Sequence, residues 1–253
     1  MNPIQEGRLL VCALQFLTRL PTPRLNGFQP AWIGRSTRYF PLVGQLVGLI
    51  SALVWLGAGR MWSAWPAAVL AVGASVLATG AFHEDGLADT ADGLGGGSTP
   101  EKRLAIMKDS RIGTYGAMAL GLVTMLRIAA LAGASPWRGA LALLAAHGAG
   151  RAAAVLAMAT QPYVGDSASA KAGASPQTVN GANAAIAALI ALWPFLLFDW
   201  RAGALGLGLG GLAAVVLLVQ ARRLIGGRTG DVLGAVEQLA EVGVLLGATL
   251  VSP

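Results

Sequence analysis

Long apolar runs separated by short polar connections set the pattern of this chain. A helix needs about 20 predominantly apolar residues to cross the hydrocarbon core of a bilayer. Runs close to this length lie at about 41–59, 66–82, 115–134, 139–160, 182–198, 202–221 and 231–251. The pattern therefore predicts an all-α fold, a polytopic integral membrane helical bundle of about seven spans, with residues 1–253 forming a single domain.

Two segments depart from this pattern. Residues 8–20 are apolar but too short to span, and arginines and prolines close them, so we expect a short N-terminal interfacial or re-entrant helix there. Residues 83–113 form the longest polar segment, and residues 98–101 within it predict a helix start: a capping hydroxyl, a proline in the first turn and an acid. The first ten residues lack the pattern of a cleavable signal peptide, so none is expected.

The composition agrees with a membrane protein. Hydrophobic residues make up 55% of the chain, charged residues 12%, and the mean hydropathy is +0.63, far from the balance of a soluble domain. The single cysteine, Cys12, excludes an internal disulfide framework. The net charge of +6 indicates first a lipid bilayer with anionic headgroups and second anionic substrates. No nucleic acid is needed to explain it.

The basic residues predict an orientation in the membrane. With the N-terminus in the cytoplasm, 13 of the 18 lysines and arginines fall in cytoplasmic segments and 3 on the opposite side. The remaining two, Arg127 and Arg151, fall within predicted spans. Because positive charge concentrates on the cytoplasmic side, the polar segments 83–113 and 161–181 should face the cytoplasm, and any chemistry should take place there.

Acidic residues are unusually concentrated at one point. The chain has 12 of them, and four lie within nine positions: Glu84, Asp85, Asp89 and Asp92. On a helix the three aspartates, at i, i+4 and i+7, project from one face. A divalent cation is the commonest way to hold such like charges together, and Mg²⁺ suits carboxylates, waters and phosphate oxygens. The alternative is a solvated helix face that ends in a glycine cap. The glycine run that follows offers backbone N–H groups to an anion: Gly95, Gly96 and Gly97.

Groups suited to binding phosphate occur in two further polar segments. The first follows the predicted short helix and contains Lys108, Asp109 and Arg111. The second is a glycine-rich loop directly before an apolar run and contains Arg228, Thr229 and Asp231. The first group would also suit a surface helix. The second predicts either an anion-binding nest or an interhelical turn capped by Thr229 or Asp231.

Five ionisable residues lie at membrane depth or near its edge, where they are costly and often functional: Arg127, His147, Arg151, Glu237 and Glu241. His147 and Arg151 are four residues apart, as are Glu237 and Glu241, so each pair can share a helix face. They either touch substrate or metal or pair with one another to hold helices together.

Several segments, in order along nearly the whole chain, resemble the cobalamin synthase family, the adenosylcobinamide-GDP ribazoletransferases. They are 16–21 (FLTRLP), 40–44 (FPLVG), 83–97 (HEDGLADTADGLGGG), 106–116 (IMKDSRIGTYG) and 226–235 (GGRTGDVLGA). The acidic segment followed by Met-Lys-Asp-Ser-Arg is the most specific of these features. No motif position departs from the family pattern.

This resemblance implies a multi-pass enzyme of the bacterial or archaeal inner membrane that acts late in cobalamin (vitamin B12) biosynthesis, in nucleotide loop assembly. Such an enzyme joins adenosylcobinamide-GDP to α-ribazole or its 5′-phosphate, releases GMP and requires Mg²⁺. A homo-oligomer, or association with other enzymes of nucleotide loop assembly, is compatible with this function, although no residue argues for either.

The reaction suggests roles for the candidate residues. We expect Asp85, Asp89 and Asp92 to bind Mg²⁺ directly or through water, with Glu84 as a further ligand or a group behind the ligands. One of these carboxylates, or Asp109, would deprotonate the attacking hydroxyl. The expected contacts to the pyrophosphate and the departing GMP come from Lys108, Arg111 and Arg228.

Two other functions are alternatives to this one. A CDP-alcohol phosphotransferase also places aspartates on membrane helices around a metal, but its Asp-Gly is followed by Ala-Arg, whereas Asp85-Gly86 is followed by Leu87-Ala88-Asp89. A cation or corrinoid transporter would carry acids at mid-membrane in paired half-helices and an internal repeat. The sequence has no clear repeat, and its acids cluster at one membrane face.

Overall fold

The structure, a computed structural model, describes residues 2–165, 179–197 and 200–250, so most of the polar segment 161–181 and the ends of two predicted spans lie outside it. The described residues form helices and no strand. These helices are α1 (Pro3–Leu17), α2 (Ala31–Ser36), α3 (Phe40–Ala58), α4 (Ala64–Thr79), α5 (Phe82–Gly96), α6 (Pro100–Met107), α7 (Thr114–Ala132), α8 (Pro136–Thr160), α9 (Gly181–Leu192), α10 (Trp200–Ile225) and α11 (Gly230–Leu250), with 3₁₀ turns η1 (Thr37–Tyr39) and η3 (Trp193–Leu197).

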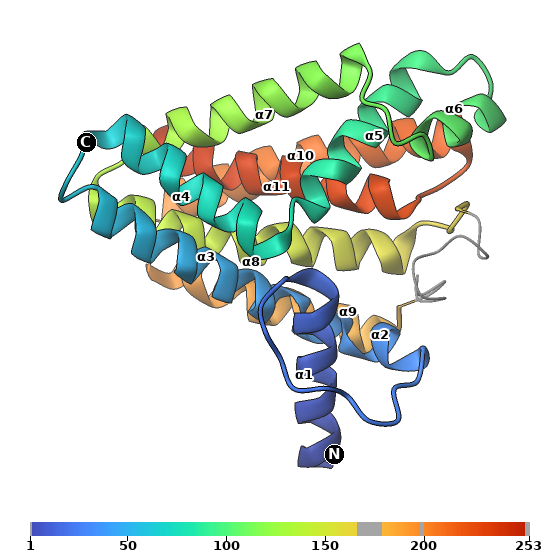
Figure 1. Ribbon diagram of the computed structural model, residues 1–253, viewed down its shortest axis with the longest axis horizontal. Coiled ribbons are helices and arrows are strands. Elements are labelled where there is room, and N and C mark those ends of the chain that lie inside the picture. The colour runs from blue at the N-terminus through green and yellow to red at the C-terminus, as the bar shows by residue number, and fades with distance from the viewer. Residues whose placement is uncertain (1, 166–178, 198–199, 251–253) are drawn as a thin grey trace.

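Helix α8 lies at the centre of an elongated bundle. It packs against α3 and α11, and α10 packs on the far side of α11 (Figure 1). The apolar part of α8 is 78% buried, whereas those of α7 and α10 are only 28% buried. Helices α7 and α10 therefore expose apolar side chains on the outside of the bundle, as lipid-facing helices do, and the predicted all-α membrane fold is confirmed.

The predicted number of spans is not confirmed. Among the described residues, four helices are long and apolar enough to cross a membrane: residues 31–58, α7, α8 and α10. A fifth is possible if α4 and α5, which meet at a 91° bend, count as one span. The predicted run at 182–198 forms the shorter α9 and η3, and α11 carries two glutamates in its middle.

Glycine residues let the long helices pack closely. A Cβ at Gly48 of α3 would lie 2.6 Å from the Leu143 carbonyl oxygen of α8. A Cβ at Gly210 of α10 would lie 2.6 Å from the Ala240 carbonyl oxygen of α11. Small residues at helix contacts are how membrane helices maximise van der Waals contact, since lipid gives no hydrophobic drive between helices.

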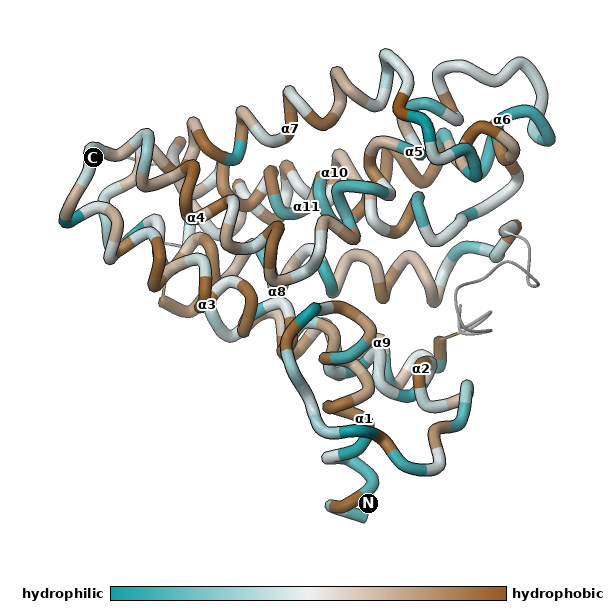
Figure 2. The backbone as a smooth tube through the Cα atoms, viewed as in Figure 1, coloured by the Kyte–Doolittle hydropathy of each residue, from teal (hydrophilic) through white to brown (hydrophobic). Residues whose placement is uncertain are grey.

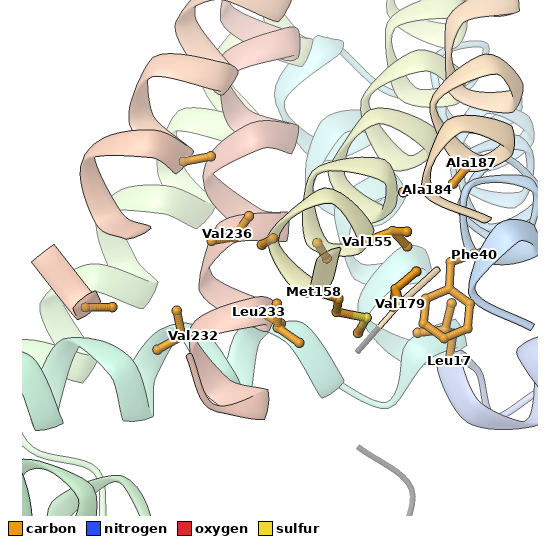
Figure 3. Packing of buried hydrophobic residues seen from close by; sticks show 14 of the residues in the cluster. Leu17, Phe40, Val155, Met158, Val179, Ala184, Ala187, Val232, Leu233 and Val236 are labelled. Atoms are coloured by element: carbon orange, nitrogen blue, oxygen red, sulfur yellow. The ribbon is translucent and has the colours of Figure 1, made fainter. Parts of the chain in front are cut away.

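The largest apolar cluster lies near the end of the bundle that carries α5. Figure 3 shows Val155 and Met158 of α8 between Val232 and Leu233 of α11 on one side and Phe40 of α3 on the other. These side chains are nearly inaccessible to solvent. The cluster fixes the first turns of α11 against α8, and α11 in turn packs against α5.

A sharp bend places α5 at the end of the bundle. Gly80 and Ala81 both have left-handed backbone conformations, with φ of 68° and 57°, and this ends α4 before α5 begins. The N-terminal segment braces the bend: the Arg19 N–H donates to the Ala78 carbonyl (2.8 Å). In Figure 2 hydrophilic residues gather on α5 and α6, at one end of a bundle whose middle is mostly apolar.

Helix α1 agrees with the short N-terminal helix predicted at 8–20, although it begins earlier. Asn2 caps it, with its side chain accepting from the Ile4 N–H (3.1 Å), and it ends at Leu17. Its 15 residues are too few to span a bilayer. It projects sideways from the bundle (Figure 1), as expected of a helix that lies along a membrane surface.

Candidate active site

The acidic stretch forms helix α5, as its spacing predicts. The three aspartates run along it from the surface into the protein. Asp85 is exposed, Asp89 is half-buried and Asp92 is buried. We call these three residues the aspartate row. Its N-terminal end exposes carboxylates to solvent, whereas its last carboxylate, that of Asp92, lies inside the fold.

Asp92 joins α5 to the start of α7. Its Oδ2 accepts from the Gly113 N–H (2.7 Å) and its Oδ1 from the Gly116 N–H (2.9 Å). The first N–H groups of a helix have no partner within the helix, and the N-terminus favours negative charge. A Cβ at Gly116 would collide with this carboxylate, so the glycine makes room for it. Asp92 thus has a structural role, and its role as a metal ligand remains a prediction.

Helix α6 begins where the sequence predicts. The Thr99 hydroxyl accepts from the Lys102 N–H (3.3 Å), and Pro100 is the first helical residue. Helix α6 ends at Met107, so exposed Lys108 lies at its C-terminus.

Asp109 and Arg111 bind each other. Arg111 Nη2 lies 2.6 Å from Asp109 Oδ2, and the Arg111 backbone N–H also donates to this carboxylate (3.1 Å). The hydrogen bonds from Arg111 lower the pKa of Asp109 to about 2. A carboxylate with so low a pKa is a weak base, which argues against Asp109 as the group that deprotonates the acceptor.

The loop before α11 is a capped interhelical turn, one of the two structures predicted for it. The Thr229 hydroxyl accepts from the Val232 N–H (3.2 Å) and donates to Asp231 Oδ2 (3.3 Å). Arg228 is fully buried, and it donates to the Gln161 carbonyl (3.3 Å) and lies over the Tyr163 ring. Burial lowers the pKa of the Arg228 guanidinium. Binding of substrate phosphate by this loop remains a prediction.

Segments far apart in the sequence meet along α5. A Cβ at Gly86 would lie 2.8 Å from the Asp231 carbonyl oxygen, so α5 touches the backbone of the first turn of α11. A Cβ at Gly93 would lie 2.9 Å from the Arg103 carbonyl oxygen of α6. Together with the bonds from Asp92 to α7, these contacts surround α5 with the segments 106–116 and 226–235.

The glycine run after the aspartates lets α5 end close to its neighbours. A Cβ at Gly95 would lie 2.8 Å from the Tyr115 ring, and one at Gly97 would lie 2.7 Å from the Arg103 backbone nitrogen. Gly96 has more room, and the Gly97 N–H donates to the Gly93 carbonyl. Close packing therefore explains two of the three glycines, and anion binding by this run remains a prediction.

The side of α5 that carries Glu84 faces a buried ionic centre. We define this centre as the connected side chains of Ser75 (α4), Glu84 (α5), Arg127 (α7), His147 and Arg151 (α8), and Glu237, Gln238 and Glu241 (α11). Apart from Glu84, which is 13% exposed, all of these side chains are buried. The five ionisable residues predicted at membrane depth thus form one network, and most of the bonds in it join different helices.

Two arginines form ion pairs with the three glutamates of the ionic centre. Arg127 forms ion pairs with Glu84 (Nη1 to Oε1, 3.1 Å) and with Glu241. Arg151 forms ion pairs with Glu237 and with Glu241 (Nη1 to Oε2, 3.3 Å). A buried charge is tolerated only when it is paired and hydrogen-bonded. The alternative in which these residues hold helices together therefore accounts for the observed contacts.

The ionic centre also holds the one trio of potential metal ligands, within the described residues, whose ligand atoms lie within 4.8 Å of one another: His147, Glu237 and Glu241. Its carboxylates already pair with Arg127 and Arg151, so a metal ion would have to displace guanidinium groups that have no access to water. The carboxylates of the aspartate row do not form such a trio. A cation at Asp85 and Asp89 would instead complete its coordination with water and phosphate oxygens, as Mg²⁺ does.

Sequence reasoning missed two members of the ionic centre. The Ser75 hydroxyl accepts from Arg127 Nη2 (3.2 Å), and Gln238 Oε1 accepts from Arg127 Nη1 (3.0 Å). Gln238 Nε2 also donates to Glu84 Oε1 (3.3 Å). In the sequence, Ser75 and Gln238 stand out only as polar residues inside apolar runs. Serine is too common at such positions to be informative.

An open groove of about 540 Å³ lies beside the site rather than in it. Its walls are mostly apolar and come from α5, α10 and α11, with Leu87 and Leu94 on α5 and Arg223 on α10. On the 3.6-residue helical period, Leu87 and Leu94 lie on the side of α5 opposite the aspartate row. The aspartates therefore do not open into this groove.

Comparison with known proteins identifies the family. The sequence model of the family described as cobalamin-5-phosphate synthase (CobS) matches residues 9–249. An adenosylcobinamide-GDP ribazoletransferase of Leptothrix cholodnii is 43% identical over 253 residues, covering 96% of each chain. That of Bradyrhizobium diazoefficiens is 47% identical over 250 residues (97% of this chain, 93% of the relative), and that of Vibrio cholerae 38% over 239 residues (94% and 92%). No solved structure matches the chain. The chain belongs to the cobalamin-5-phosphate synthase family, whose members are transferases of cobalamin biosynthesis.

Proposed function

We propose that the protein joins adenosylcobinamide-GDP to α-ribazole, or to its 5′-phosphate, giving adenosylcobalamin or its phosphate and GMP. The observation that carries this proposal is that the segments resembling the family meet around α5. Contacts at Gly86, Asp92 and Gly93 bring α11, α7 and α6 to one acidic helix. If the members of a family share one reaction, the segments that they have in common should lie around the reacting groups, as these segments lie around α5.

The aspartate row suits Mg²⁺. Exposed Asp85 and half-buried Asp89 supply hard oxygen donors one turn apart on the same face of α5. Mg²⁺ usually takes one or two protein carboxylates and fills its remaining positions with waters and substrate phosphates. We therefore propose Asp85 and Asp89 as the residues that hold the ion. When bound, Mg²⁺ would neutralise charge on the pyrophosphate of the donor.

The protein's part in the reaction is chiefly to bind and orient. The acceptor hydroxyl attacks the phosphorus atom that stays with the corrinoid, the bond from this phosphorus to the bridging oxygen breaks, and GMP leaves with that oxygen. Such a transfer needs alignment and compensation of negative charge, but no covalent intermediate with the protein. Lys108, exposed at the end of α6, is the proposed phosphate contact, and a carboxylate of the aspartate row takes the proton of the hydroxyl.

We also propose an inner-membrane location with α5 facing the cytoplasm. The basic residues favour this orientation, because the connections on the α5 side hold most of the lysines and arginines. Both substrates would then approach from the cytoplasm. The apolar parts of the corrinoid and of the ribazole base can rest against the membrane surface.

The test is turnover by the purified protein in liposomes, supplied with adenosylcobinamide-GDP and α-ribazole, with Mg²⁺ or with EDTA. We expect GMP and a cobalamin product in equal amounts, and only with Mg²⁺. α-Ribazole and its 5′-phosphate are supplied in parallel, and the ratio of their kcat/KM values identifies the preferred acceptor. A folded protein that forms neither product from either acceptor would contradict the proposal.

A further inference from the structure

Glu84 and Asp85 are adjacent on α5 but point in different directions. The Glu84 side chain is 13% exposed, and its Oε1 accepts from Arg127 Nη1 (3.1 Å) and from Gln238 Nε2 (3.3 Å). Asp85 is exposed. Successive residues of an α-helix are about 100° apart, so the rotation of α5 that seats Glu84 in the ionic centre turns Asp85 out of it.

Arg127, on α7, connects α5 to both α4 and α11 through this centre. Its guanidinium is 1% exposed and binds Ser75 of α4, Glu84 of α5 and both Gln238 and Glu241 of α11. These contacts use the planar fork of the guanidinium, whose N–H groups point in fixed and different directions. A lysine at the same place would keep the charge but could not hold all of these partners at once.

Arg151 provides an internal comparison. It is equally buried and pairs with Glu237 and Glu241 in the same ionic centre. Within the described residues, Arg151 bonds to His147 of its own helix and to Glu237 and Glu241 of α11. It reaches α5 only indirectly: Glu237 Oε2 lies 3.8 Å from His83 Nδ1, and Glu241 pairs with Arg127. The two arginines are therefore equally buried and belong to the same network, but of the two Arg127 is the one that bonds directly to the acidic helix α5.

From these contacts we propose that Arg127 is a positioning residue for the metal-binding aspartates, and that Glu84 is its anchor on α5 rather than a ligand of the metal. Arg127 fixes the rotation of α5 about its own axis, and this rotation decides where Asp85 and Asp89 point. Neither Arg127 nor Glu84 touches the reacting atoms. The inference rests on the proposed function in that α5 is taken to hold the divalent cation.

The test compares Arg127→Lys with Arg151→Lys, the same chemical change at equal burial in one network. Binding of Mn²⁺, as a probe for Mg²⁺, is measured from the electron paramagnetic resonance signal of free Mn²⁺, and thermal unfolding is followed in parallel. We expect both variants to unfold at lower temperature. Arg127→Lys should weaken Mn²⁺ binding by about 10-fold to 100-fold, the usual effect of losing a group that orients metal ligands. Arg151→Lys should stay within about twofold of wild type, and equal weakening by both would overturn the proposal.

Two further variants test whether Glu84 anchors Arg127 or binds the metal. Their results do not require Arg127→Lys to fold. Glu84→Gln keeps an oxygen that accepts from Arg127 and Gln238 but removes the charge, so Mn²⁺ affinity should stay within about twofold of wild type. Glu84→Ala removes the anchor and should weaken Mn²⁺ binding at least about 10-fold. If Glu84→Gln weakens binding as much as Asp85→Asn does, Glu84 is a ligand and the proposal fails. Because Mn²⁺ binding is measured without corrinoid, a wild-type protein that binds Mn²⁺ but lacks turnover would count against the proposed function alone.

Discussion

Helix α5 carries acids in two contrasting regions of the molecule. On one side, Asp85 and Asp89 lie at the polar end of the bundle, within reach of solvent. On the other, Glu84 joins Glu237 and Glu241 in a buried centre where arginines pair with each of them. Acids in contact with water can exchange waters and substrate oxygens around a metal, whereas buried acids need fixed partners. We therefore propose that the first region carries the chemistry and that the second sets the geometry of the helix.

The largest expected effect on turnover comes from the exposed region. Asp85→Asn and Asp89→Asn each remove a charge from the proposed Mg²⁺ site, and kcat for GMP release should fall by about 10²–10³-fold, the usual effect of losing one electrostatic group at a reaction centre. Thermal unfolding should remain close to wild type, because neither side chain is fully buried. Near-normal turnover in either variant would remove that residue from the metal site.

The largest expected effect on stability comes from the buried region. Arg151→Met leaves Glu237 and Glu241 short of a cation, and loss of one partner from a buried ion pair costs about 3–5 kcal/mol in the free energy of unfolding. Reversible unfolding in mixed micelles measures this. Arg60→Met is the control, because Arg60 is exposed and should change stability by less than about 0.5 kcal/mol. Equal losses in the two variants would show that the ionic centre does not stabilise the bundle.

A smaller effect is expected where α5 touches α11. A Cβ at Gly86 would meet the Asp231 backbone, which cannot move cheaply, so Gly86→Ala should cost about 1–3 kcal/mol and lower kcat by shifting the aspartate row. Gly73→Ala is the matched control, since a Cβ at Gly73 of α4 meets nothing within 4 Å and should be neutral or stabilising. Unchanged activity in Gly86→Ala would separate the α5–α11 contact from catalysis.

The smallest effect concerns Asp109. Its bonds to Arg111 hold its pKa at about 2, below the usual value, so it stays ionised at every pH at which the enzyme is assayed. Any stabilisation from this pair is therefore present above the ordinary carboxyl pKa and is lost only as the pH falls toward 2. In Asp109→Asn the acid limb of the pH–rate profile should lie at the same pH as in wild type. A shifted limb would identify Asp109 as the base.

The sequence predicts the local features well. The apolar runs at 41–59, 115–134 and 139–160 match α3, α7 and α8 within a few residues, because run length and helical period are properties of neighbouring residues. The same holds for α5, whose acid spacing predicts a helix with three aspartates on one face. The start of α6 follows from its cap at Thr99 and Pro100.

The tertiary contacts could not be predicted in this way. Glu84 and Arg127 are 43 residues apart, and Asp92 and Gly116 are 24 apart, and nothing local signals either pairing. The left-handed Ala81 that helps to turn α5 away from α4 is also unexpected for a residue with a Cβ. The sequence therefore grouped Glu84 with the aspartates, as a further metal ligand or a group behind the ligands, and gave no sign that its carboxylate accepts from Arg127 and Gln238 inside the bundle.

The most direct test of this account is to map the metal on the chain. Fe²⁺ is exchanged into the purified protein in place of Mg²⁺, ascorbate and peroxide are added, and the backbone cuts made by radicals at the bound iron are located by mass spectrometry. We expect cuts in α5 near Asp85 and Asp89 and in the first turn of α11 beside Asp231, all suppressed by excess Mg²⁺. Cuts confined to the middle of α8 and α11, around His147 and Glu241, would place the metal in the ionic centre and contradict it.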